Sequence, residues 1–214
     1  MQIDVLYILI VLTVIFFSMT LHEVMHGFAA YWLGDDTAAK EGRLTFNPIK
    51  HIDPFLTIAL PLILAVIGAP IFGGAKPVPF NPFKLRYDDW GAALVAFAGP
   101  LTNFVIAFIL FASFALSKVE TSTFAGQFLI VGVYVNLGFF VFNMIPVPPL
   151  DGSRVLYALA PEFVRRGMEA IERFGLIFIF ALVMIASPLI GIIISAGTGA
   201  IVRWFGLLFG ITVA

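Results

Sequence analysis

Long apolar segments alternate with shorter polar connections along the whole of this chain. A helix needs about 20 residues to span the hydrocarbon core of a bilayer. Five segments approach or exceed that length, at residues 5–33, 55–72, 91–116, 124–145 and 174–194. A weaker apolar tail, 200–214, carries Arg203 and Trp204, and we expect it to lie at the interface or to span poorly. Transmembrane β-strands would be about half as long and would alternate in polarity, so the pattern predicts helices.

Prolines and glycines modify this picture in one region. Pro61, Gly68 and Pro70 interrupt the second apolar segment. The connection that follows contains Lys76-Pro77-Val78-Pro79-Phe80, and each proline disfavours helix in the residue before it, which predicts strand or loop. The expected fold is therefore an all-α polytopic membrane protein. It would have about five to six transmembrane or re-entrant helices and a short extended, β-like membrane-associated segment.

The composition agrees with a membrane protein and excludes several other classes. Of the 214 residues, 61% are hydrophobic and only 12% are charged, whereas a soluble domain is about a quarter charged. This excludes an ordinary cytosolic enzyme and a disordered chain. The net charge is −1, and no basic patch suggests a nucleic-acid partner. Cysteine is absent, which excludes disulfides, thiolate metal sites and a cysteine nucleophile.

The first apolar segment contains the sequence His22-Glu23-Val24-Met25-His26, the pattern H-E-x-x-H. Residues four apart share one face of a helix, so both imidazoles can bind one metal ion. Glu23 is then placed to act as general base toward water. Ionisable groups inside a membrane segment are costly and rarely without function. The pattern predicts a catalytic zinc site, which takes three protein ligands and one open position.

The third ligand has several candidates near the apolar segments. They are His51, Asp53, Asp88, Asp89 and Asp151. Asp151 stands out because it follows three prolines where the fourth apolar segment ends. Irregular backbone at membrane depth is tolerated only against protein or a water-filled cavity. The alternative for Asp151-Gly152 is an ordinary surface turn, and local sequence alone does not decide between the two.

Three motifs in order resemble the site-2 protease family of intramembrane zinc metalloproteases. They are His22-Glu23-x-x-His26-Gly27, Ala98-Gly99-Pro100-Leu101-Thr102-Asn103 and Asn143-x-x-Pro146-x-Pro148-x-Leu150-Asp151-Gly152. The resemblance spans about 20–156, and the third motif is the most specific. The apolar segment 55–72 is an addition to the family's minimal three-helix core.

The resemblance implies a complete set of site residues. His22, His26 and Asp151 would bind one Zn²⁺ per chain, with Glu23 as general base and Asn143 contacting substrate or transition state. The chain would be a minimal member of the family. It would form a single membrane-embedded protease domain over 1–214, with a catalytic core at 5–157 and C-terminal helices at 158–214.

The shared site constrains how the second apolar segment runs. If that segment crossed the membrane, the first and fourth segments would end on opposite sides. If it is a re-entrant hairpin, they end on the same side, and ten of the twelve Lys and Arg residues share that side. A full crossing splits them seven and five. Positive residues favour the cytoplasm. We therefore expect a hairpin, an external N-terminus and a site nearer the cytosolic face.

The expected activity is hydrolysis of peptide bonds within or near transmembrane segments of membrane proteins, in regulated intramembrane proteolysis. The expected partners are a substrate helix and the lipid bilayer, in a prokaryotic plasma membrane. The segment 73–80 either pairs with unwound substrate as an added strand or is a plain linker. Asn103 either has a site role or joins helices, and His51 either approaches the site or is interfacial.

Two other functions remain open from sequence. One is a membrane metallohydrolase acting on a lipid-like substrate, which H-E-x-x-H alone would permit. The other is a non-proteolytic metal-binding scaffold or transporter. Glu23 argues against the scaffold, because a structural zinc needs no general base.

Overall fold

The computed structural model, which describes residues 5–68 and 73–212, contains four helices long and apolar enough to cross a membrane. They are α1 (Val5–Trp32), α4 (Asp88–Ser117), α5 (Phe124–Asn143) and α8 (Gly175–Phe209). Shorter helices are α2 (Thr37–Lys40), α3 (Leu60–Val66), α6 (Asp151–Leu159) and α7 (Glu162–Glu172), with helical turns η1 (Pro48–His51), η2 (Pro54–Ala59) and η3 (Pro82–Lys84). No β-strand occurs within the described ranges. The prediction of an all-helical fold is confirmed for these residues, and the four long apolar helices fit a multi-pass membrane protein.

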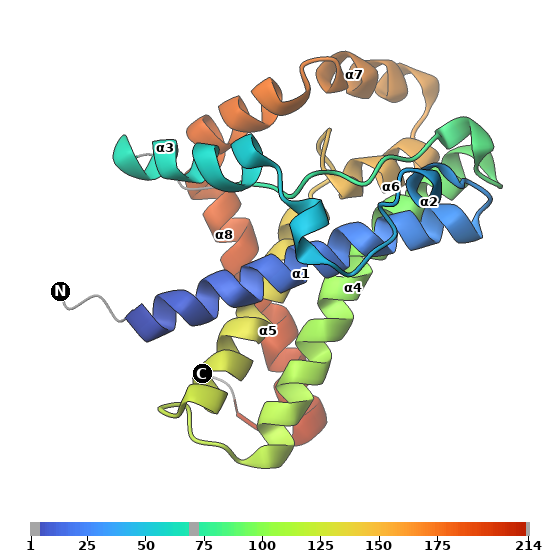
Figure 1. Ribbon diagram of the computed structural model, residues 1–214. Helices are drawn as coiled ribbons and strands as arrows, with labels where there is room; N and C mark the ends of the chain where they lie inside the picture. Colours follow the sequence, from blue (N-terminus) through green and yellow to red (C-terminus); the bar gives the residue numbers. More distant parts are fainter. Residues whose placement is uncertain (1–4, 69–72, 213–214) are drawn as a thin grey trace.

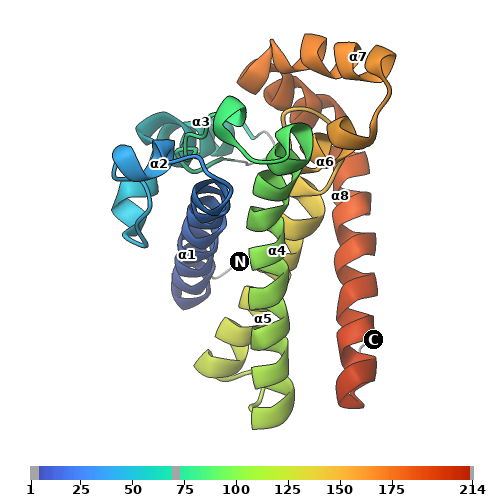
Figure 2. The same cartoon turned by 90° about the vertical axis from the view of Figure 1, so that its right-hand side faces the viewer.

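The antiparallel pair α4 and α5 forms the centre of the bundle. Helix α1 packs against both on one side, and α8 packs mainly against α5 on another (Figures 1 and 2). The α1–α4 and α5–α8 connections gather at the upper end of Figure 2, whereas the α4–α5 connection lies at the lower end. The chain segments that carry the predicted chemistry therefore share one end of the molecule.

The main hydrophobic core lies between α4, α5 and α8. Its buried members are Ala107, Phe111, Val133, Leu137, Val202 and Phe205. Close approach of α8 to α5 depends on Gly197, where an added Cβ would meet the Val141 side chain at 2.9 Å. Small residues serve this purpose between membrane helices, where lipid provides little hydrophobic drive for association. The outward faces expose large apolar side chains, as a surface against lipid requires.

Helix α8 corrects the prediction of a separate C-terminal tail. The fifth apolar segment and the tail form one helix that continues from Gly175 to Phe209. Residues 195–200 are small and include no proline, so nothing in this stretch prevents the backbone from continuing as a helix. The Thr198 hydroxyl donates to the Ile194 carbonyl one turn earlier at 2.7 Å. Phe205 lies in the core, so tertiary packing anchors this part of the helix. The last two tail residues lie outside the described ranges.

The second apolar segment leaves and returns at one end of the bundle. Its flanks bond to each other: the Gly74 N–H donates to the Leu56 carbonyl at 3.1 Å, and the Lys76 N–H donates to the His51 carbonyl at 2.8 Å. Helix α3 lies at the same end as α2 and α6 (Figure 2). Pro70 and Phe72, predicted to close this segment, lie outside the described residues. This connectivity is the one that a hairpin requires.

Candidate metal centre

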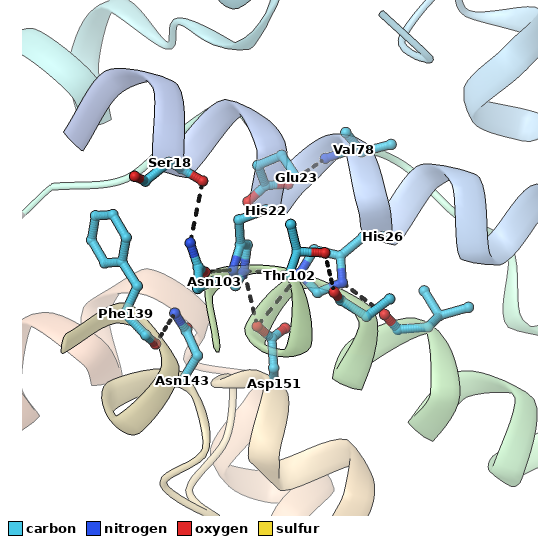
Figure 3. A network of polar contacts seen from close by, with 12 residues as sticks. Ser18, His22, Glu23, His26, Val78, Thr102, Asn103, Phe139, Asn143 and Asp151 are labelled. Atoms are coloured by element: carbon cyan, nitrogen blue, oxygen red, sulfur yellow. Dashed lines mark hydrogen bonds and ion pairs between the residues drawn. The ribbon is translucent and has the colours of Figure 1, made fainter. Parts of the chain in front are cut away.

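Two helices bring the three predicted metal ligands together. His22 and His26 lie one turn apart on α1, and Asp151 is the first residue of α6. Asp151 Oδ2 lies 3.1 Å from His22 Nε2 and 3.5 Å from His26 Nε2, and the two Nε2 atoms are 2.9 Å apart (Figure 3). These residues form the one His/Cys/Asp/Glu group able to hold a metal ion within the described residues. The other four candidates for third ligand lie outside it.

The separations fit a small tetrahedral cation. Zinc ligands at about 2.0–2.1 Å from the ion are about 3.3 Å from each other in tetrahedral geometry. The three measured separations, 2.9, 3.1 and 3.5 Å, bracket that value. Two imidazoles and one carboxylate with an open fourth position are the donor set of a catalytic zinc site. The arrangement therefore fits zinc in both distance and chemistry.

The outer nitrogens of both imidazoles are held by carbonyl oxygens. His22 Nδ1 lies 2.6 Å from Asn103 Oδ1, and His26 Nδ1 lies 2.7 Å from the Val95 backbone carbonyl. A carbonyl oxygen only accepts, so each Nδ1 donates its hydrogen and each Nε2 presents a lone pair to the centre. Two facing lone pairs repel, and a cation between them would remove that repulsion. Partners of this kind commonly fix metal-binding histidines.

Gly99 on α4 provides the space beside the two imidazoles. A Cβ at this position would lie 2.7 Å from His22 Nε2 and closer still to His26 Nε2. Real Cβ atoms essentially never approach other atoms this closely, so any side chain here would enter the volume that a metal ion needs. This contact gives the glycine of the second motif a physical role.

The backbone around Asp151 fixes the carboxylate at the helix start. A Cβ on Gly152 would collide with the Met144 backbone, which shows how tightly α6 begins against the end of α5. At the other end of α6, the Arg165 guanidinium donates to the Ala160 carbonyl at 2.9 Å and pairs with Asp89 of α4 at 2.6 Å. Helix α6 is thus fastened to α4, the helix that also carries Gly99.

Glu23 lies beside His22 and faces the extended segment after α3. Its Oε2 accepts the Val78 backbone N–H at 3.0 Å (Figure 3). The buried Arg43 guanidinium donates to the Lys76 and Pro77 carbonyls at 2.8 and 3.2 Å. The buried Asp35 carboxylate accepts the Asn81 N–H at 2.5 Å. The predicted extended segment is therefore a fixed loop along α1, and it is not paired as a strand in the described residues.

Three further residues considered from sequence have defined positions. The Asn143 amide, at the last residue of α5, donates to the Phe139 carbonyl at 3.0 Å (Figure 3). His51 is 2% exposed, and its Nε2 donates to the Thr45 carbonyl at 2.8 Å. It lies outside the ligand group and holds loop backbone instead. Asn103 contacts His22 of α1 and also bonds to Asn136 of α5, so its position fits both of the roles considered for it.

Sequence reasoning missed Asn136 and the backbone groups of Val95 and Val78. Asn136 is 1% exposed on α5, and its Oδ1 accepts from Asn103 Nδ2 at 2.9 Å. A polar amide within an apolar segment was a signal that could have identified it. The two backbone contacts had no such signal, because every residue carries a carbonyl and nearly every residue an N–H.

Comparison with known proteins agrees with the geometry. Residues 117–186 match the family described as Peptidase family M50. YwhC of Bacillus subtilis, named as a predicted zinc metalloprotease, is 39% identical, with 95% of this chain and 92% of the relative covered. Rip2 of Mycobacterium tuberculosis, named likewise, is 30% identical, covering 77% of this chain and 62% of the relative. No solved structure matches.

Proposed function

This chain belongs to peptidase family M50 and is a zinc metalloprotease, and from that premise we propose that it hydrolyses peptide bonds within or near transmembrane segments of membrane proteins. The observation that carries the proposal is the position of the His22–His26–Asp151 group on and beside a helix apolar enough to cross a membrane. A protease site carried by a membrane-spanning helix would take substrates from within the bilayer. Its biological setting would be regulated intramembrane proteolysis in a prokaryotic plasma membrane.

One Zn²⁺ per chain would be held by His22 Nε2, His26 Nε2 and the Asp151 carboxylate. When bound, zinc supplies Lewis-acid activation of water and of the scissile carbonyl. Glu23 takes a proton from the attacking water and passes it to the leaving amine. The Val78 N–H occupies Oε2 of Glu23, which leaves Oε1 for this transfer.

Asn143 is the proposed donor to the oxyanion. One hydrogen of its amide goes to the Phe139 carbonyl, and a side-chain amide carries two. The second hydrogen is available to the substrate oxygen as negative charge develops there, which is the point at which a fixed donor lowers the barrier. The position of Asn143 as the last residue of α5, at the end of the bundle that carries the metal ligands, supports this role.

A helical substrate must unwind locally, because its carbonyls are bonded within its own helix. The loop beside Glu23 could pair with the unwound chain by strand addition, but only over part of its length. The Lys76 and Val78 N–H groups are already bonded, and Pro77 and Pro79 have none. We therefore place the pairing at the Val78 and Pro79 carbonyls and the Phe80 N–H.

Cleavage of a model transmembrane peptide tests this function. We expect Glu23→Gln to lower kcat by at least about 100-fold, as loss of a general base does, while zinc content stays at the wild-type level. Equal cleavage by wild type and Glu23→Gln would contradict the role of Glu23. Stoichiometric zinc in a wild-type protein that cleaves no membrane peptide would contradict the proposed substrate class.

A further inference from the structure

A line of buried polar groups crosses the bundle behind the metal centre. It begins at Asn136 on α5, passes through Asn103 on α4 and ends at His22 on α1. Asn103 is 0% exposed and Asn136 is 1% exposed. Asn136 belongs to none of the three sequence motifs. Two fully buried amides in a membrane bundle are costly unless both are bonded, so their arrangement needs a physical reason.

Each bond in this line fixes the orientation of the next group. Asn136 Nδ2 donates to the Gly132 carbonyl of its own helix at 2.8 Å, which turns Oδ1 toward α4. That oxygen accepts from Asn103 Nδ2 at 2.9 Å. Asn103 Oδ1 is then left to accept from His22 Nδ1 at 2.6 Å. The direction of donation runs from the ligand ring outward to the α5 backbone.

Reversal of the Asn103 amide is disfavoured by Asn136. A flipped Asn103 would set its oxygen against Asn136 Oδ1, and two acceptors cannot bond. It would also present an N–H to His22 Nδ1, which would move the ring hydrogen to Nε2. Nε2 faces Asp151 and His26, so the hydrogen would occupy the position of a metal bond. Asn136 therefore controls which ring nitrogen of His22 is available.

We propose that Asn136 is a positioning residue that acts through Asn103 to keep His22 Nε2 directed at the metal. This inference rests on the proposed zinc site and extends it to a third helix. Joining α4 to α5 would need only the bond between the two asparagines. The 2.6 Å contact to His22 is the shortest of the line, and joining α4 to α5 does not require it. The remaining acceptor near Asn103 Nδ2, the Ser18 carbonyl, lies at 3.4 Å.

Zinc affinity of the purified chain in nanodiscs, measured by chelator competition, tests the proposal without an activity readout. We expect Asn103→Leu to weaken zinc binding about 10- to 100-fold, as loss of a partner behind a ligand does. Asn136→Leu should weaken it about tenfold, because Ser18 keeps part of the orientation. The double variant should bind zinc no more weakly than Asn103→Leu alone, because both act through one path.

Two further variants separate this role from a structural one. Asn136→Asp in its neutral form keeps an oxygen acceptor for Asn103 and a donor for Gly132, and we expect zinc affinity near wild type. Thr198→Val removes a buried hydroxyl that bonds only within α8, and should lower thermal stability without changing zinc affinity. Asn136→Leu with lowered stability and wild-type zinc affinity would overturn the proposal, as would Asn136→Asp binding zinc as weakly as Asn136→Leu.

The ligand variants show which proposal fails. If His22→Ala and Asp151→Ala lose zinc while Asn136→Leu keeps wild-type affinity, the positioning role is wrong and the proposed metalloprotease site stands. If His22→Ala keeps full zinc affinity, both are wrong, because Asn136 then has no ligand to orient.

Discussion

At the scale of single residues, the metal centre depends on the missing side chain of Gly99 as much as on its ligands. Gly99 faces both imidazoles from α4, and an added Cβ would lie 2.7 Å from His22 Nε2. The ligands themselves follow from ordinary rules: two histidines one turn apart on one helix, each with its outer nitrogen held by a carbonyl. The space between the two imidazoles, however, is set by Gly99 on a different helix, α4.

Gly99→Ala should therefore abolish stoichiometric zinc binding while leaving the ligands in place. The alanine methyl would occupy the space of the ion, although alanine favours helix over glycine by about 1 kcal/mol. Zinc content of the purified protein is the measurement. Gly138→Ala on α5 is the matched control, because a Cβ there meets nothing within 4 Å, and it should keep full zinc. Full zinc in Gly99→Ala would show that the ion lies elsewhere.

At the scale of elements, the loop 75–81 is a fixed structure although it has no regular secondary structure. Arg43 supports its start through two carbonyls, and Asp35 supports its end through the Asn81 N–H. Gly27 lets it lie close to α1, since a Cβ there would come within 2.9 Å of the Val78 side chain. These contacts place the Val78 N–H at Glu23. The loop thereby links the second apolar segment to the predicted general base.

Arg43→Met should loosen this loop without affecting the metal. Each lost bond from a charged donor is worth about 1.5–3 kcal/mol, so amide exchange at Val78 should accelerate at least about tenfold. Peptide cleavage should fall with it, while zinc content stays unchanged. Hydrogen exchange and cleavage together provide the measurement. Lys50→Met, which removes an exposed cation from the same connection, is the control and should change neither.

At the scale of the whole molecule, the site occupies the end of the bundle where most connections gather. The α1–α4 and α5–α8 connections lie at this end (Figure 2), and they carry ten of the twelve Lys and Arg residues. Cytoplasmic loops carry such an excess, so we propose that this end faces the cytosol. The mutual bonds between the flanks of the second apolar segment support a hairpin that enters the bilayer from the same side.

Cysteine labelling tests this topology, and the chain has no cysteine of its own. We expect Phe46→Cys and Phe83→Cys, at two exposed positions before and after the hairpin, to react only when a membrane-impermeant reagent has access to the cytosol. Ser122→Cys, in the α4–α5 connection, should react from outside. Labelling of positions 46 and 83 from opposite faces would contradict the hairpin.

The sequence by itself determined the features that depend on local spacing. Long apolar segments identified α1, α4 and α5, and the helical period placed His22 and His26 on one face with Glu23 beside them. The sequence did not predict that the fifth apolar segment and the tail form one helix, α8. Apolarity alone did not reveal that Phe205 packs in the core and anchors the tail there. For Asp151, local sequence left a surface turn as an alternative.

The tertiary structure decided what depends on contacts between distant segments. It brought Asp151 to within 3.1 Å of His22 Nε2 across more than half the chain, and it revealed the space at Gly99 and the line from Asn136. It also supplied the Val95 carbonyl and the Val78 N–H, which side-chain identity cannot indicate because backbone groups are common to all residues. The two histidines were thus readable from local spacing, whereas the approach of Asp151, the orientation of the imidazoles and the space between them came from helix packing.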